Sequence, residues 1–456
     1  MKKQMTADEQ FKKMTETPVE RLIFSLAIPT IISMLITSIY NMADTYFVSQ
    51  ISTSASASVG IAFSLMVIIQ AIGFTLGMGS GNYISRLLGN KNRDYSSKVI
   101  ATGFFTALLL GIVIAVMGLI FLNPLVYALG ATETIAPYAK DYIKYILFGI
   151  PFMTASFVLN GTLRFQGSAF YAMLGIGTGG ILNIILDPIF IFKLNMGTSG
   201  AALATVISQF ISFCILFYNS SKGGNIRISF KNFTPKWDLY REILRGGLPS
   251  FYRQFLASIA LIFLNFSAGV YGDAAIAAMS IVGRVIHFSI SVMLGFGQGF
   301  QPVCGFNYGA KLYDRVMNAF WFSLKVSVIG LICISSVGFI ISSKIISIFR
   351  KEDLEVILIG TKAIRFQFLT LPLSAWVIMM NMLLQTIGKS KEASIVAVAR
   401  QGMFFIPAIL ILPHIIGLLG VQLSQPISDI LSFIITLFIG IRVLKELKSL
   451  QLVDSE

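Results

Sequence analysis

The chain has 456 residues, of which 55% are hydrophobic and 12% charged, and its mean hydropathy is +0.79. Soluble domains carry roughly 25% charged residues, so the composition excludes a soluble globular protein and indicates a polytopic membrane protein. The formal net charge of +14 would suit a nucleic-acid partner. Its distribution argues against one, because most basic residues fall on one side of the predicted membrane spans.

Apolar segments long enough to cross a membrane begin near Leu22 and recur along the whole chain. A hydrocarbon core of about 30 Å needs about 20 apolar residues per helix, and backbone groups in lipid must satisfy their own hydrogen bonds. These segments therefore favour helices over a barrel. The first one lacks a cleavage pattern and reads as a retained signal anchor. We predict twelve spans, at 22–48, 56–84, 97–122, 137–163, 170–193, 199–219, 242–271, 276–306, 318–342, 356–385, 394–415 and 418–443.

The two halves of the chain repeat one pattern. Six positions recur 220 residues later with the same residue: Pro29, Gly77, Gly79, Gly89, Lys91 and Asp94 return as Pro249, Gly297, Gly299, Gly309, Lys311 and Asp314. Three more recur after 221 residues, since Pro151, Asn160 and Gly167 return as Pro372, Asn381 and Gly388. With an even number of spans in each half, the repeats are parallel. We predict an all-α polytopic membrane protein with two six-helix bundles related by a pseudo-twofold axis along the membrane normal.

The distribution of charged and polar residues predicts the segment boundaries and the orientation of the chain in the membrane. We assign 1–21 as an N-terminal segment, 22–219 as the N-lobe, 220–241 as the inter-lobe linker, 242–443 as the C-lobe and 444–456 as a tail. Both termini are predicted to be cytoplasmic, in the inner (cytoplasmic) membrane. The basic residues on that side are Lys2, Lys3, Lys12, Lys13, Arg21, Arg86, Lys91, Arg93, Lys98, Arg164, Lys222, Arg227, Lys231, Lys236, Arg241, Arg245, Lys311, Arg315, Lys389, Lys391, Arg442, Lys445 and Lys448. The opposite side holds mainly Lys193, Lys344, Arg350 and Lys351.

Three prolines are candidate hinges. Pro29 and Pro249 stand early in the first span of each half, where a missing N–H and a ring clash kink a helix. Symmetric kinks would allow symmetric bending, and a static kink filled by neighbours is the alternative. Pro188 leaves the carbonyl of Ile184 without its usual helical donor. The glycines at 77, 79, 297 and 299 are predicted to allow close helix packing.

Two carboxylates in the first half lie within predicted spans, where an ionisable group commonly costs about 2.5 to 3.5 kcal/mol. Asp44 ends a polar stripe at helical spacing that runs through Ser33, Thr37, Tyr40 and Asn41. Such a stripe faces protein or water. An alternative is that Asp44 bonds backbone near a helix end.

Asp187 follows Asn183 by one helical turn, and the next span offers Thr205, Ser208, Gln209 and Ser212 at similar spacing. Oxygen ligands around a carboxylate suit a small cation or a proton. The alternatives for Asp187 are a helix cap or a structural pair with Arg164. The repeat position of Asp44 is Leu264, so any cation site belongs to the first half.

The second half carries cationic and amide groups instead: Arg253, Arg284, His287, Gln298, Gln301, Arg365, Gln367, Asn381, Gln385, Arg400, Gln401, His414, Gln422, Gln425 and Asp429. Arg284 and His287 are one turn apart, which makes a relay conceivable. We expect instead that Asp429 or carbonyl groups satisfy Arg284. The three cysteines, Cys214, Cys304 and Cys333, lack metal-binding spacing and are expected to be buried small hydrophobes.

The chain resembles the multidrug and toxic compound extrusion family, the MATE transporters. The resemblance rests on twelve spans in two bundles, the early prolines, the segments SRLLGNKNRD and GFNYGAKLYDR, and LNIILDPIFIF followed by GAALATVISQ. It implies export of organic cations in exchange for H⁺ or Na⁺. It also implies coupling residues at Asp44, Asn183, Asp187 and Thr205, which together would form a Na⁺ site, and substrate contacts at Thr37, Tyr40 and Asn160. Some relatives place an acidic ion site in the second lobe, and none is visible here.

We therefore predict a secondary active multidrug transporter, cation/drug antiport by alternating access, with no enzymatic activity and no cofactor besides the coupling ion. Its expected partners are small-molecule drugs and membrane lipids, with no nucleic acid, and we expect a monomer. The alternative is a flippase for lipid-linked saccharides, for which Arg253, Arg284, Arg365 and Arg400 would supply a cationic cavity. An intramembrane enzyme is the weakest alternative, because no catalytic cluster is visible.

Overall fold

The computed structural model describes residues 6–222, 224–349 and 353–454. The predicted basic residues Lys2, Lys3, Arg350 and Lys351 lie outside these ranges. Within them the chain is almost wholly helical. Eleven helices are long and apolar enough to cross a membrane, and a broken pair bent by 54° brings the number to as many as twelve. The predicted all-α membrane fold is confirmed.

The first half begins with a short helix, α1 (Ala7–Glu16), and then crosses the membrane six times. Its spans are α2 (Val19–Ser49), α3 (Thr53–Gly89), α4 (Arg93–Ile120), α6 (Ala136–Phe165), α7 (Ala169–Pro188) with the π-helix Ile189–Lys193, and α8 (Gly197–Asn219). A short helix, α5 (Leu122–Ala128), joins α4 to α6. The linker that follows contains the short helix Phe230–Asn232.

The second half repeats this order. Its spans are α9 (Trp237–Gly269), α10 (Asp273–Gly309), α11 (Tyr313–Ile340), the pair α13 (Leu354–Thr370) and α14 (Leu373–Thr386), the series α15 (Ser390–Val398), Ala399–Phe405 and α16 (Ile406–Ile416), and α17 (Leu418–Asp454). The short helix α12 (Ser342–Phe349) follows α11 as α5 follows α4. The predicted tail from residue 444 begins inside α17.

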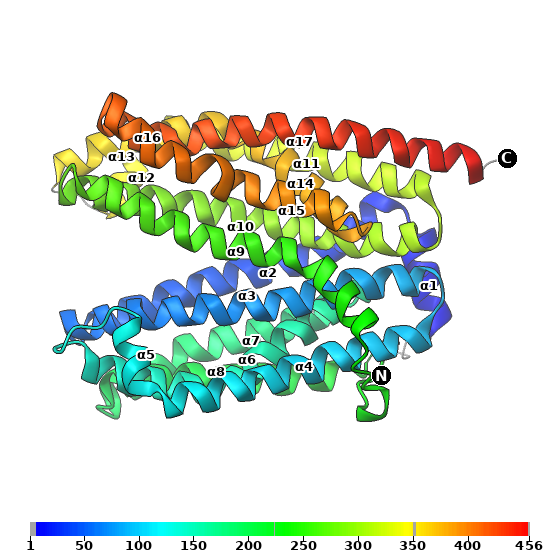
Figure 1. Cartoon of the computed structure of the whole chain (residues 1–456), viewed down its shortest axis with the longest axis horizontal. Helices are drawn as coiled ribbons and strands as arrows, with labels where there is room; N and C mark the ends of the chain where they lie inside the picture. The colour runs from blue at the N-terminus through cyan, green and yellow to red at the C-terminus, as the bar shows by residue number, and fades with distance from the viewer. Residues whose placement is uncertain (1–5, 223, 350–352, 455–456) are drawn as a thin grey trace.

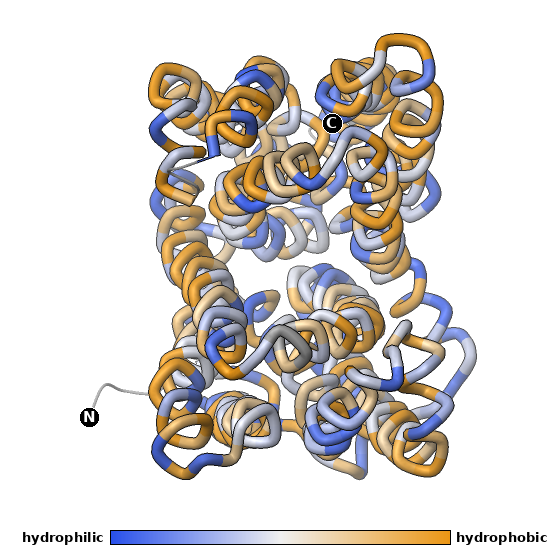
Figure 2. The backbone as a smooth tube through the Cα atoms, turned by 90° about the vertical axis from the view of Figure 1, so that its left-hand side faces the viewer, coloured by the Kyte–Doolittle hydropathy of each residue, from blue (hydrophilic) through white to orange (hydrophobic). Residues whose placement is uncertain are grey.

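The two bundles contact each other through α3 with α9 and α2 with α10. They lie close together at the end that carries both termini and diverge toward the end that carries α5 and α12 (Figure 1). Seen from the divergent end, the bundles form two separate groups of helices (Figure 2). The buried residues of α2 lie between Val19 and Thr30, apart from Val48, while Val270 at the far end of α9 is 81% exposed. The lobes are therefore sealed together only on the side of the termini.

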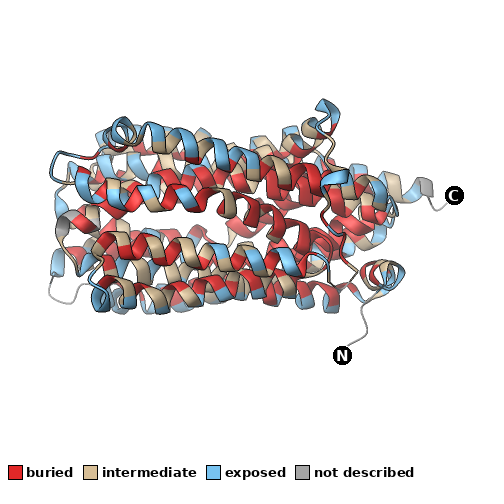
Figure 3. Cartoon of the chain, turned by 90° about the horizontal axis from the view of Figure 1, so that it is seen from below, coloured by how far each residue is buried: buried red, intermediate tan, exposed pale blue. Residues whose placement is uncertain are grey.

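Buried positions follow the helix faces that turn toward other helices, and exposed positions lie on outer faces and at the ends (Figure 3). Many exposed side chains are large and apolar, including Leu109, Ile262 and Phe438 at 57%, 54% and 71% exposure. Such surfaces suit hydrocarbon, because lipid tails are as apolar as these side chains.

Glycines permit the close approach of the lobes, and they do so symmetrically. A Cβ at Gly79 would lie 1.9 Å from the carbonyl oxygen of Ile243 in α9, and one at Gly299 would lie 2.5 Å from Cα of Ala27 in α2. The repeat-related Gly77 and Gly297 instead meet α6 and α14 of their own lobes. The predicted packing role of these glycines is confirmed.

The three candidate hinge prolines differ in setting. Pro29 and Pro249 lie inside the continuous helices α2 and α9, buried near the contact between the lobes. Pro188 ends α7, and the chain continues as a π-helix. The break in the predicted span 356–385 occurs next to Pro372, whereas its counterpart Pro151 lies inside the unbroken helix α6. Bending at Pro29 and Pro249 stays a prediction.

Helix α1 is fixed to the N-lobe at the end where the termini lie. Its N-cap Thr6 forms a capping box with Glu9, which satisfies free N–H groups of the first turn. Gln10 donates its side-chain amide to the carbonyl of Gln166. The ammonium of Lys91 lies 4.6 Å from the ring centre of Phe11. These contacts join α1 to the cytoplasmic ends predicted for α3 and α6.

The same short helix is also joined to the C-lobe. Asn307 Nδ2 donates to the carbonyl of Met14 at 3.2 Å, and Arg315 Nη2 donates to the carbonyl of Thr17 at 2.6 Å. Arg315 Nε also donates to Asn307 Oδ1 at 2.9 Å. Helix α1 therefore crosses from one lobe to the other on the side where they are in contact.

Replacement of Arg315 by alanine should loosen this helix. A hydrogen bond from a charged group is worth about 1.5–3 kcal/mol, so we expect trypsin to cut at Lys12 and Lys13 about tenfold faster in Arg315→Ala than in the wild type. Timed proteolysis followed by mass spectrometry measures this rate. Lys98→Ala, which removes an exposed charge, serves as control. Equal cleavage rates in the wild type and Arg315→Ala would show that the contact does not hold α1.

Candidate functional site

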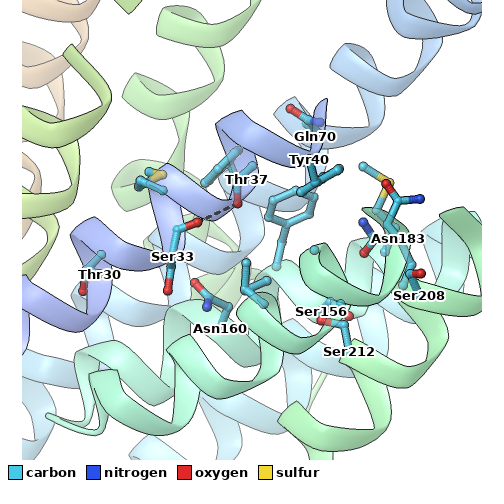
Figure 4. A pocket seen from close by; sticks show the side chains of 18 of the residues that line it. Thr30, Ser33, Thr37, Tyr40, Gln70, Ser156, Asn160, Asn183, Ser208 and Ser212 are labelled. Atoms are coloured by element: carbon cyan, nitrogen blue, oxygen red, sulfur yellow. Dashed lines mark hydrogen bonds between the residues drawn. The ribbon is translucent and has the colours of Figure 1, made fainter. Parts of the chain in front are cut away.

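A pocket opens inside the N-lobe, between α2, α3, α6, α7 and α8 (Figure 4). Among the described residues, Gln298 of α10 is the one lining residue from the C-lobe. Aromatic side chains of Tyr40, Phe74 and Phe157 line it together with hydroxyl and amide groups. The predicted polar stripe of α2 supplies one wall.

Hydroxyl groups of that stripe bond to their own helix. Thr37 Oγ1 donates to the carbonyl of Ser33 at 2.8 Å, and Ser33 Oγ donates to the carbonyl of Pro29 at 3.0 Å. Their protons are therefore used within α2, and only their oxygen lone pairs remain for a ligand. The Tyr40 phenol faces the pocket in Figure 4 and interacts with the side chain of Gln209.

All three predicted substrate residues line the pocket: Thr37, Tyr40 and Asn160. Asn160 also has a bond inside the lobe, since its Nδ2 donates to the carbonyl of Ala172 at 3.4 Å. Its repeat counterpart Asn381 donates in the same way to Ala393 at 2.7 Å. The bond that both repeats share joins neighbouring helices and uses one of the two amide hydrogens of Asn160, so its oxygen and its second N–H remain for a ligand.

The predicted coupling residues of α7 and α8 lie together. Asn183 Nδ2 donates to Asp187 Oδ1 at 3.1 Å and to Thr205 Oγ1 at 3.3 Å. Asp187 is fully buried and Asn183 is 2% exposed. A spacing of four residues, a little more than one turn, places both side chains on the same face of α7, and Asn183 bonds from that face to Thr205 of α8.

Asp44 of α2 completes the cluster. It lies close enough to Asp187 for the two carboxylates to repel each other, and it interacts with the hydroxyl of Tyr142. Tyr142 also interacts with the hydroxyl of Thr205. One polar network therefore connects α2, α6, α7 and α8.

Three buried acceptor oxygens in this network have no hydrogen-bond partner: Asp44 Oδ1, Asn183 Oδ1 and Asp187 Oδ2. Buried acceptors are nearly always satisfied, by protein or by water, so these oxygens can take a proton, a cation or a water molecule. Carboxylate, amide and hydroxyl oxygens suit a hard cation such as Na⁺. Among the described residues, no group of three or more His, Cys, Asp or Glu side chains could hold a metal ion.

The coupling cluster and the pocket share a boundary. Asn183 and Thr205 line the pocket, whereas Asp44 and Asp187 lie behind that wall. The alternative pairing of Asp187 with Arg164 is wrong, since the Arg164 guanidinium donates to Gln298. The predicted coupling residues therefore lie together, beside the pocket that the predicted substrate residues line. Their roles stay predictions.

Comparison with known proteins decides the family. The family model MatE matches residues 29–189 and 249–411, more than half of the chain. The chain belongs to the MATE family. The multidrug export protein MepA of Staphylococcus haemolyticus (strain JCSC1435) is 28% identical to it over 437 residues, covering 95% of both chains. MepA of Staphylococcus aureus (strain NCTC 8325 / PS 47) is 28% identical over 429 residues, covering 92% of this chain and 93% of its own.

Solved MATE structures share the whole fold. The outward-facing conformation of a multidrug resistance MATE family transporter of the MOP superfamily superposes with a TM-score of 0.90 at 26% identity, covering 98% of this chain and 100% of that one. A crystal structure of MATE in complex with MaL6 superposes with a TM-score of 0.90 at 26% identity, and the match covers 96% of this chain and 99% of that one. The predicted family resemblance is confirmed.

Sequence reasoning missed two features of this MATE site. Tyr142 sits early in α6 among residues without polar periodicity, so nothing in the local pattern marked it. The contact between Arg164 and Gln298 joins α6 to α10 across the two lobes. The residues are 134 positions apart, and no short-range pattern reports such a pair.

The C-lobe of this MATE protein arranges its charges differently from our expectation. Asp429 Oδ1 accepts from Arg400 Nε at 2.8 Å and from Gln425 Nε2 at 2.9 Å. Arg284 is exposed, so the expectation that Asp429 would satisfy Arg284 is wrong. Arg400 lies in the π-helix Ala399–Phe405, and its pairing with Asp429 neutralises a charge inside the lobe.

Only one of the three cysteines is buried. Cys304 is buried in α10, whereas Cys214 and Cys333 are exposed. The expectation of three buried cysteines is therefore wrong for two of them. Both lie in apolar stretches of spans that turn a face outward, where a thiol meets lipid as readily as a methyl group would.

Removal of the Tyr142 hydroxyl tests the network of this MATE protein. The Tyr142 hydroxyl interacts with Asp44, and a polar interaction of about 1 kcal/mol predicts that Tyr142→Phe weakens apparent affinity for the coupling ion about fivefold. Drug binding should change little, because Tyr142 does not line the pocket. Titration of transport with the ion measures the apparent ion affinity, and equilibrium binding of a dye measures the drug affinity. Tyr138→Phe, at an exposed position of the same helix, is the control, and an unchanged ion titration in Tyr142→Phe would remove that residue from the network.

Proposed function

We propose that this protein is a secondary active multidrug efflux transporter that exchanges organic cations for H⁺ or Na⁺. The proposal rests on one observation above all: buried oxygens without a hydrogen-bond partner lie on Asn183, which lines the pocket, and on Asp44 and Asp187 behind it. A proton or a sodium ion bound there would change the charge next to the pocket. A bound ion would therefore lower the affinity of the pocket for an organic cation, and a bound organic cation would lower the affinity for the ion.

The lining of the pocket supports an amphipathic cationic substrate. Phe74 and Phe157 lie with ring centres 4.7 Å apart, and aromatic faces attract cations. Tyr40 adds a third ring. Relatives that align over nearly the whole chain are named multidrug export proteins, which supports export of drugs over other cargo.

Ion coupling supplies enough free energy for export. One charge that moves through 100 mV is worth about 2.3 kcal/mol, so roughly 150 mV sustains a drug gradient of a few hundred-fold. Coupling requires that ion and drug differ in their affinity for the two states of the transporter. Helix α2 is the natural link, because it carries Asp44, the pocket wall and Pro29.

We propose further that both termini are cytoplasmic, in the cytoplasmic membrane. Lys98, Lys311 and Lys448 belong to the excess of basic residues at the end where the termini lie, as expected for a cytoplasmic face. With that orientation, the lobes are closed toward the cytoplasm and diverge toward the outside. Alternating access then requires the contacts of α2 with α10 and of α3 with α9 to open.

Efflux of a fluorescent organic cation from proteoliposomes tests the proposal, with Na⁺ and pH gradients imposed separately. We expect efflux to accelerate with one gradient, and the effective gradient identifies the ion. If several chemically distinct cations fail to move with either gradient, the multidrug proposal is refuted. Headgroup-dependent lipid binding would then favour the flippase, and chemical turnover of a bound lipid would favour an enzyme.

A further inference from the structure

We propose that Arg164, at the floor of the pocket, is a subsite for the carboxylate or another small anionic group of a substrate. The pocket would then accept zwitterionic amphipathic molecules as well as simple cations. This inference rests on the proposed drug transport and adds a substrate class to it. Its support is a buried guanidinium that lines the pocket and has only neutral partners.

Arg164 lies near the end of α6 and is 4% exposed. One terminal nitrogen donates to the side-chain oxygen of Gln298, and the other lies 3.3 Å from the sulfur of Met78. Its Nε has no partner. Within the described ranges, no carboxylate oxygen lies within 4.0 Å of Arg164, and the four ion pairs there involve other residues.

An arginine keeps its charge at every physiological pH. Buried charges are almost always paired with opposite charge, and Arg400 of the C-lobe follows that rule through Asp429. Arg164 instead has an amide oxygen, a thioether and the ring of Phe165, whose centre lies 5.7 Å from its Cζ, and none of these carries a negative charge. Its guanidinium therefore keeps an unmet preference for an anion, and arginine binds carboxylates with two parallel hydrogen bonds.

Other groups at this end of the pocket do not compete as donors. Thr30 and Ser33 also line it, and their hydroxyls already donate to the carbonyls of Leu26 and Pro29. The lining contains no second cationic side chain among the described residues. An anionic group that reaches the floor would therefore find Arg164 as its main donor.

The acidic cluster lies far enough away to leave this charge uncompensated. Along α2 the lining runs from Thr30 to Tyr40, a rise of about 15 Å, and Asp44 lies one turn beyond, about 20 Å from Thr30. The pocket thus has a positive end near the contact between the lobes and a negative end near Asp44. Such a dipole fits a substrate whose ammonium and carboxylate are well separated.

The present acceptor of Arg164 comes from the other lobe. Gln298 belongs to α10, is 6% exposed and lines the same pocket. A carboxylate bound to Arg164 would replace this amide oxygen. Anion binding and the contact between Arg164 and Gln298 therefore compete, so loss of the Gln298 side chain should not weaken anion binding.

Two dyes of nearly equal shape test the subsite on purified protein. Rhodamine B carries a free carboxylate, and its ethyl ester does not. Fluorescence polarisation gives both dissociation constants for the wild type, Arg164→Gln, Arg164→Lys and Gln298→Leu. We expect Arg164→Gln to weaken rhodamine B at least about tenfold, as for loss of a charge-assisted pair, and to change the ester less than about threefold. Arg164→Lys should keep part of the affinity, and Gln298→Leu should bind rhodamine B as tightly as the wild type or more tightly.

Equal losses for both dyes in Arg164→Gln would overturn the subsite and leave Arg164 a structural role. So would failure of the wild type to bind rhodamine B. If Arg164→Gln does not fold, modification of wild-type arginines by phenylglyoxal decides: rhodamine B should protect Arg164 and the ester should not, and equal protection would refute the subsite. These binding results are independent of efflux, so a failure of gradient-driven export leaves the subsite testable, and the reverse also holds.

Discussion

Asp187→Asn should reduce gradient-driven efflux of an organic cation to the rate of protein-free liposomes. The substitution keeps the shape of the side chain and removes the charge that the Asn183 amide and any bound cation share. Loss of a charged hydrogen-bond partner costs about 1.5–3 kcal/mol, so affinity for the coupling ion falls about 10- to 150-fold. The neutral side chain also mimics a permanently protonated site, which leaves no charge change to drive exchange. Asp44→Asn should act in the same direction.

The measurement is dye efflux from proteoliposomes under separate Na⁺ and pH gradients, together with equilibrium binding of the dye. Binding should persist in Asp187→Asn, because Asp187 does not line the pocket. Asp238→Asn, an exposed aspartate at the start of α9, controls for loss of one negative charge. If Asp187→Asn keeps half of the wild-type efflux under both gradients, the proposed coupling site is wrong.

Gly79→Val should separate the lobes on the side of the termini. A Cβ at Gly79 would lie 1.9 Å from the Ile243 carbonyl oxygen. Because that oxygen belongs to the backbone of α9, the clash can be relieved only if α3 moves away from α9. Overpacking of this kind typically costs 1–3 kcal/mol, which shifts a two-state equilibrium about 5- to 150-fold. Gly299→Val should act alike, because its Cβ would meet the backbone of Ala27 in α2. The state closed at this end therefore loses population to a state in which it is open.

Spin labels at Lys98 and Asn318 report this change, since both positions are exposed on opposite lobes near the termini. The exposed Cys214 and Cys333 are first replaced by serine. We expect the distance distribution to move to longer values in Gly79→Val. Gly60→Val, in the same helix with open space around the Cβ, is the matched control. Identical distributions in the two variants would show that the glycine contact does not hold the lobes closed.

Much of the fold was predictable because lipid leaves few solutions. A span needs about 20 apolar residues, so hydropathy alone located the helices, and the recurrence of Pro29 and Gly79 as Pro249 and Gly299 identified the two halves. Most boundaries shifted by a few residues, whereas α17 continues to Asp454, well beyond the predicted end at residue 443. The break beside Pro372 was not foreseen, because its counterpart Pro151 lies in an unbroken helix and the difference depends on the surrounding helices.

The candidate site also has a part that the sequence predicts and a part that depends on how the helices pack. Polar groups in an apolar span are costly enough to be noticed singly, so the need of Asp44, Asn183 and Asp187 for partners could be predicted from the residues alone. Helical spacing also determined which residues of one span share a face. Three pairings became visible once the helices were packed together: Tyr142 joins these residues, Arg164 meets Gln298 rather than Asp187, and Asp429 pairs with Arg400. Those contacts cross between helices, and periodicity within one helix carries no information about which helix lies opposite.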